Sequence, residues 1–113
     1  MKRGQVWSAA GGKDYAGKPR PVVVLQDNSF DLTDSVTVCA FTTDPTDAPL
    51  FRILIKANST NGLHSDCRLM VDKVTTIPRS KLGAYIGQLA DEDMLRLNRA
   101  LLVFLGMAAP AET

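Results

Sequence analysis

Short apolar runs separated by polar, turn-rich segments fill the first 90 residues of the chain. Several runs alternate apolar and polar positions or are rich in β-branched residues, which is typical of strands in a small β-domain. Glycine, proline, aspartate and asparagine gather between the runs and favour turns there. We expect strands at residues 5–9, 21–26, 35–41, 50–55, 68–72 and 85–89.

After residue 90 the apolar positions change to helical spacing. Met94, Leu97 and Leu101 share one helical face, so the pattern predicts a helix over residues 91–105 that ends at Gly106. Three carboxylates in its first turn suit the positive end of the helix dipole. One helix beside five or six short antiparallel strands predicts a mainly β fold, a small barrel-like sheet that the helix caps. Apolar side chains near the helix end cover more than one face, so we expect a second subunit to cover part of them.

Composition narrows the class of protein. The 113 residues predict one domain, 1–113, and 13 Lys and Arg against 12 Asp and Glu give a net charge of +1. No overall positive field therefore attracts nucleic acid, and any contact with a polyanion must be local. Without a signal region or an 18-residue apolar run, we expect a cytoplasmic protein that does not enter a membrane. Cys39 is expected to be a buried hydrophobe and Cys67 lies at a strand entrance, while their pairing stays open.

Familiar catalytic and metal-binding motifs are absent from the sequence. It contains no phosphate-binding Gly-rich loop, no Cys-x-x-Cys and no His-Glu-x-x-His. The single histidine, His64, follows Asn61 and Gly62 in a predicted turn, and we expect it to be a solvated loop residue. The sequence therefore predicts neither a metal nor a cofactor.

Arg20 stands between two prolines directly before a four-residue apolar run. Pro19 and Pro21 restrict the backbone on both sides, which nearly fixes the direction of the guanidinium group. Arginine offers five donors in a fixed geometry that suits phosphate. The sequence therefore predicts an anion-binding arginine, although a strand entrance with a solvated charge fits the same residues.

Two further polar groups follow predicted strands. Thr42 and Thr43 come directly after residues 35–41, and Asp72 lies at the end of the strand predicted at residues 68–72. Strand ends are common places for ligand-binding groups in small β-folds. Thr42, Thr43 and the following Asp-Pro are equally an ordinary turn sequence, so both interpretations stay open.

Four segments together resemble the MazF/PemK family of toxin-antitoxin ribonucleases. They carry an Arg-Gly-x-Val-Trp opening, a Gly-x-x-Arg-Pro-Val-Val-Val block, an Ala-Phe-Thr-Thr sequence and a Val-Asp-Lys-Val-Thr-Thr-Ile sequence. These motifs lie at residues 3–7, 17–24, 40–43 and 71–77. With the closing helix, the resemblance covers nearly the whole chain in order and spacing.

The resemblance implies an SH3-like barrel of five to seven antiparallel strands that pairs into a homodimer. It implies sequence-specific, metal-free cleavage of single-stranded RNA and inhibition by a cognate antitoxin. Carried over by motif, the catalytic arginine is Arg20 and the catalytic hydroxyl is Thr42, with Thr43 as the second choice. The Arg-x-Asp pair of the PemK branch is incomplete here, because Asp72 is present but Met70 stands at the arginine position.

The predicted RNA-binding residues lie mainly in the loop before the second strand. Lys13, Tyr15 and Lys18 supply charge and a stacking face, and Pro19 and Arg68 complete the set. A solvated hairpin loop is the alternative interpretation of this composition. The family uses the corresponding loop to contact RNA and antitoxin, which favours the functional interpretation.

The predicted chemistry uses the ribose 2′-hydroxyl as an internal nucleophile and leaves a 2′,3′-cyclic phosphate and a 5′-hydroxyl. Arg20 would stabilise the transition-state charge, and no residue stands out as the general base. Two other functions fit a fold of this kind: a CcdB-like poison of DNA gyrase and a non-catalytic SH3-like binding module. The gyrase poison depends on a C-terminal Trp-Gly-Ile, whereas this chain ends in Pro-Ala-Glu-Thr.

Overall fold

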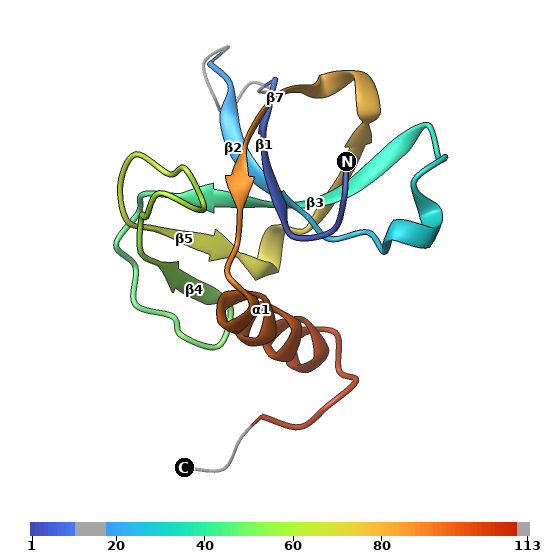
Figure 1. Ribbon diagram of the computed structural model, residues 1–113. Helices are drawn as coiled ribbons and strands as arrows, with labels where there is room; N and C mark the ends of the chain where they lie inside the picture. The colour runs from blue at the N-terminus through green and yellow to red at the C-terminus, as the bar shows by residue number, and fades with distance from the viewer. Residues whose placement is uncertain (11–17, 111–113) are drawn as a thin grey trace.

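A computed structural model describes residues 1–10 and 18–110 (Figure 1). Within this part of the chain, seven strands precede one long helix. The strands are β1 (Gln5–Ala9), β2 (Arg20–Val24), β3 (Ser35–Thr42), β4 (Arg52–Ile55), β5 (Cys67–Met70), β6 (Thr75–Pro78) and β7 (Leu82–Gln88). The helix is α1 (Asp91–Phe104), and short 3-10 turns form η2 (Asn28–Phe30), η3 (Val71–Lys73) and η4 (Arg79–Lys81).

The strands are all paired antiparallel in the order β4-β5-β3-β2-β1-β7, and β6 pairs with β3 beside this path. The long strand β3 pairs with β6 through residues 35–38, with β2 through residues 38–40 and with β5 through residues 41–42. Because β6 leads through η4 into β7, which pairs with β1, the strands curl towards a closed ring. The expected mainly β, SH3-like fold with a C-terminal helix is confirmed.

Helix α1 lies beside β4 and η3 and closes the lower part of the sheet (Figure 1). Leu97 is fully buried and Ala100 nearly so, and both pack in one core with Ile53, Leu69 and Val71. A second apolar cluster, which includes Val22, Val36 and Met70, fills the other side of the sheet. The alternating exposure of β4 and the buried face of α1 follow from the periodicities that the sequence shows.

The opening Arg-Gly-x-Val-Trp motif holds the N-terminus to the body of the domain. The Arg3 guanidinium donates a hydrogen bond to the carbonyl oxygen of Leu25, 2.7 Å away, and another to the side chain of Asn98 in α1. Gly4 has a φ of +88°, a backbone conformation that side-chain-bearing residues rarely adopt. These residues of the motif therefore have a structural role.

Most predicted strands need correction at their boundaries. Strands were expected at residues 21–26, 50–55 and 85–89, whereas β2, β4 and β7 span Arg20–Val24, Arg52–Ile55 and Leu82–Gln88, and β3 extends one residue beyond its predicted end, to Thr42. The sequence places a strand over residues 68–72, but β5 ends at Met70, so Asp72 lies in the turn η3. Strand β6 was missed, because Thr75 and Thr76 interrupt its apolar pattern. The helix ends at Phe104, one residue before its predicted end, and Gly106 follows with a φ of +75°.

The structure also bears on the expectations for the two cysteines, the end of the helix and the membrane. Cys39 and Cys67 are both buried and both free thiols. Leu102, Phe104 and Leu105 are exposed at the end of α1, and their coverage by a second subunit stays a prediction. Over residues 1–10 and 18–110, no helix has the length and apolar character needed to span a membrane.

Candidate active-site cleft

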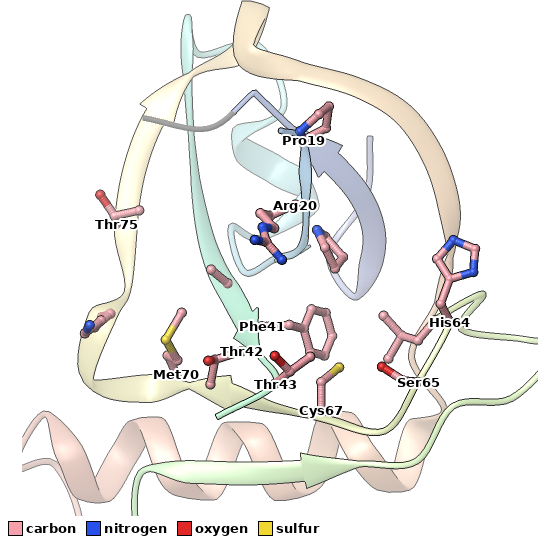
Figure 2. A pocket seen from close by; sticks show the side chains of 14 residues that line it. Pro19, Arg20, Phe41, Thr42, Thr43, His64, Ser65, Cys67, Met70 and Thr75 are labelled. Carbon is pink, nitrogen blue, oxygen red and sulfur yellow. The ribbon is translucent and has the colours of Figure 1, made fainter. Parts of the chain in front are cut away.

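A cleft of about 780 Å³ opens where β2 begins and β3 ends (Figure 2). The loop between β4 and β5 forms one side of the cleft, and η3 with the start of β6 forms another. The described residues that line it are Pro19, Arg20, Pro21, Ala40, Phe41, Thr42, Thr43, Leu63, His64, Ser65, Cys67, Met70, Lys73 and Thr75. The cleft thus combines two cations, an imidazole and several hydroxyls with an apolar floor.

Arg20 projects into this cleft from the first residue of β2 (Figure 2). Its backbone is paired with Ala9 of β1, and the following Val22, Val23 and Val24 are buried. Arg20 itself is exposed, so the strand fixes its backbone while its side chain lines the cleft. Pro19, predicted to contact RNA, lines the same cleft.

Thr42 and Thr43 reach the cleft from the end of β3. The Thr42 hydroxyl oxygen accepts a hydrogen bond from the backbone N–H of Asp44, 3.1 Å away. Thr42 therefore begins the turn after the strand, as its Asp-Pro context suggests, and also faces the site. Because the hydroxyl accepts in this bond, its own proton can still be donated to a ligand.

The other predicted RNA-binding residues lie away from the cleft lining or outside the described residues. Lys13 and Tyr15 fall in the segment 11–17, which the structure does not describe. Lys18 is exposed just before the cleft residue Pro19. Arg68 is the direct cross-strand neighbour of Thr42 but does not line the cleft.

Asp72 forms a two-point ion pair with Arg52. The Arg52 Nε atom lies 2.8 Å from Asp72 Oδ1, and the Nη2 atom lies 3.0 Å from Oδ2. The hydrogen bonds from Arg52 hold the pKa of the Asp72 carboxyl below its usual value. Arg52 is the cross-strand partner of Met70, so the neighbouring strand supplies an arginine beside the position where the PemK pattern expects one.

The structure brings residues into the cleft that sequence reasoning did not place there. His64, expected to be a solvated loop residue, is exposed as predicted and also lines the same cleft as Arg20 and Thr42, at the edge formed by the loop between β4 and β5 (Figure 2). Ser65, Lys73 and Thr75 also line it. The histidine is unique in the chain, which is the one signal in the sequence that could have drawn attention to it.

Cys67 lies on the cleft floor, yet burial raises the pKa of its thiol to about 11. The Cys67 thiol is therefore neutral near pH 7 and is a poor nucleophile there. Among residues 1–10 and 18–110, no three His, Cys, Asp or Glu side chains gather in a way that could hold a metal ion. The expectation of metal-free chemistry stays a prediction.

A family model described as PemK-like, MazF-like toxin of type II toxin-antitoxin system matches residues 2–105. The chain belongs to this family. A curated PemK/MazF relative, the probable endoribonuclease MazF of Mycolicibacterium smegmatis, is 56% identical over 108 residues, which cover 96% of this chain and 99% of the relative.

Solved structures show the same fold. An endoribonuclease from a mycobacterial species, solved in complex with its cognate antitoxin, has a TM-score of 0.80 at 24% identity and covers 97% of this chain and 99% of its own. The Mycobacterium tuberculosis toxin MazF-mt6 has a TM-score of 0.78 at 25% identity, covering 92% of this chain and 98% of its own. This PemK/MazF chain therefore matches its relatives over nearly their full length.

Proposed function

We propose that this PemK/MazF-family protein is an endoribonuclease toxin that cuts single-stranded RNA at specific sequences without a metal ion. Attack of a ribose 2′-hydroxyl on the adjacent phosphodiester gives a 2′,3′-cyclic phosphate and a 5′-hydroxyl. The toxin acts as a homodimer, and a cognate antitoxin inhibits it. The observation that carries the proposal is the position of Arg20 and Thr42, from different strands, on one open cleft.

The comparisons support the class of activity and of partner. The relative with 56% identity is named a probable endoribonuclease, and a structural neighbour was solved bound to its antitoxin. A net charge of +1 agrees with a local contact to RNA through the cleft, where Arg20 and Lys73 supply positive charge.

Arg20 would stabilise the extra negative charge that develops on the phosphoryl oxygens as the 2′-oxygen attacks. Preorganised donors of this kind lower the barrier most where charge appears in the transition state. A guanidinium group provides charge and hydrogen-bond donors and is a poor base. Thr42 would donate its hydroxyl proton to a phosphate oxygen.

Thr42→Val is expected to lower kcat/KM for RNA by about tenfold, because the variant keeps the side-chain shape but loses the hydrogen bond to the phosphate, together with the one that Thr42 accepts from the Asp44 N–H. Thr42→Ser, which keeps the hydroxyl, should retain most of the activity. Initial rates on a cleavable oligonucleotide measure both variants. An unchanged rate for Thr42→Val would remove Thr42 from the site.

Purified protein incubated with a long single-stranded RNA in EDTA tests the proposal as a whole. Discrete fragments with 5′-hydroxyl and cyclic phosphate ends are expected. Intact RNA would overturn the proposal and leave a non-catalytic binding module or, if supercoiling by DNA gyrase is blocked, a gyrase poison. Addition of Mg²⁺ should not raise the rate, and mapping the ends would give the recognition sequence.

A further inference from the structure

We propose that His64 is the general base of this reaction and takes the proton from the attacking 2′-hydroxyl. The proposal rests on the proposed function and assigns the one role that the residues described so far leave open. It follows from two independent observations. One is the chemistry of the groups that line the cleft, and the other is the way in which the loop between β4 and β5 is held.

The described lining of the cleft offers few groups that can accept a proton near neutral pH. The side chains of Arg20 and Lys73 are cations that donate hydrogen bonds, and threonine and serine hydroxyls are not bases at this pH. The Cys67 thiol has a pKa raised to about 11 by burial, so it offers no thiolate. No Asp or Glu is among the described residues of the lining. His64 is left, and a neutral imidazole accepts a proton readily.

The buried side chain of Asn61 anchors the loop that carries His64. Asn61 is fully buried, and its side-chain oxygen accepts hydrogen bonds from the backbone N–H groups of Asn58, 3.1 Å away, and Leu63, 3.0 Å away. Its amide nitrogen donates to the carbonyl oxygen of Lys56 at 2.9 Å. All polar atoms of this side chain are therefore used to fix the backbone just before His64.

The two ends of the loop are also joined. The Asp66 carboxylate, two residues after His64, accepts a hydrogen bond from the backbone N–H of Ala57 at 2.8 Å. Gly62 has a φ of +70°, and a Cβ atom there would lie 2.4 Å from the carbonyl oxygen of Ile86. The loop packs tightly onto β7 at this glycine, so His64 is presented from a fixed backbone, as a catalytic group requires.

The 2′-hydroxyl proton moves to the free nitrogen of the neutral His64 imidazole, and the O2′–P bond forms. The P–O5′ bond breaks, and the 5′-oxygen takes a proton from solvent water in the open cleft. The hydroxide that remains then removes the extra proton from the imidazolium. Arg20 faces the same cleft and stabilises the phosphoryl oxygens throughout (Figure 2).

His64→Gln tests the proposal, because glutamine keeps hydrogen bonding but cannot accept a proton near neutral pH. We expect kcat/KM to fall about 100-fold, at the low end of the usual range for a general base. The wild-type rate should rise with pH along an acid limb that the variant lacks. Among the described residues, the charged and titratable groups that share the cleft with His64 are Arg20, Lys73 and Cys67, and the nearby Asp66 carboxylate is engaged with the N–H of Ala57.

A substrate with sulfur in place of the bridging 5′-oxygen separates a base from an acid, because a thiolate leaves without protonation. If His64 is the base, His64→Gln stays about 100-fold slower than wild type on this substrate. Recovery to the wild-type rate would make His64 an acid and would overturn the proposal. A His64→Gln rate within about threefold of wild type on normal RNA would also overturn it.

Ser59→Ala is the matched control, since Ser59 is exposed in the same loop and does not line the cleft. Its rate and its thermal unfolding should match those of the wild type, and His64→Gln should unfold at the same temperature. If the wild-type protein itself leaves RNA intact in EDTA, the proposed function fails. If the wild type cleaves RNA and only His64→Gln is impaired, the proposed function stands and the result concerns His64 alone.

Discussion

Arg20→Ala is expected to lower kcat/KM for RNA cleavage by about 1,000-fold or more, the largest effect of any single substitution in the cleft. The guanidinium group offers both a full positive charge and several donors to the phosphoryl oxygens, and alanine offers neither. The expected loss exceeds that for Thr42→Val, because a neutral hydroxyl contributes only one hydrogen bond.

The fold should survive this substitution, because Arg20 is exposed while β2 is held by Val22, Val23 and Val24. Arg20→Lys is the informative companion: it keeps the charge but loses the forked geometry, so an intermediate rate is expected. Single-turnover cleavage, circular dichroism and light scattering measure activity, folding and the proposed dimerisation. If Arg20→Ala fails to fold, Arg20 is a structural residue and the assignment is wrong.

Asp72→Asn is expected to lower the free energy of unfolding by about 1.5 kcal/mol at pH 7. The substitution removes the charge from a two-point ion pair that is largely shielded from solvent, with side-chain exposures of 13% for Arg52 and 23% for Asp72. Arg52→Met should cost a similar amount, and the double variant should cost much less than the sum of the two. Urea unfolding measures all three.

The pH dependence gives this prediction a second readout. Hydrogen bonds from Arg52 lower the pKa of Asp72 in the folded state below 3.8, so the carboxyl binds its proton less readily there than in the unfolded chain. The stabilisation is complete above the unfolded pKa and is lost as pH falls through the folded pKa. The difference between wild type and Asp72→Asn should therefore hold from pH 7 to about 5 and shrink below about 4.

Cleavage rates of the same variant decide whether Asp72 has a catalytic role as well. At a temperature where both proteins are fully folded, a purely structural Asp72 leaves kcat/KM within about threefold of wild type. A drop well beyond that would keep Asp72 as a catalytic residue, in agreement with the family resemblance. Equal stability of the wild type and Asp72→Asn would show that the ion pair contributes nothing to the fold.

Much of the fold could be predicted from local patterns. Strand β1 begins and ends at the predicted residues, and α1 differs only at its last residue, because alternation and helical spacing report directly on a buried face. Strand β6 was missed because it gives no such signal. Thr75, Thr76 and Pro78 are exposed, so this strand is held by pairing with β3 and has almost no buried face of its own.

The sequence predicted only those residues of the candidate site that lie at the ends of recognisable strands. Arg20 and Thr42 each lie at the end of a recognisable apolar run, and the register of β2 on β3 brings both to one cleft. The Arg52 partner of Asp72 depends on the register of β4 on β5, which no local pattern reveals. His64 depends on Asn61 folding a polar loop back on itself, which the composition of the loop does not indicate.

The long strand β3 has a consequence for anyone who wishes to divide this toxin into two complementary fragments. Its eight residues pair with β2, β5 and β6, so a cut inside it would break the one strand that joins these three. The exposed residues 45–47, just beyond the strand, belong to no strand or helix. A chain divided there keeps Arg20 and Thr42 on one piece and His64 on the other, so cleavage would report reassembly of the two pieces.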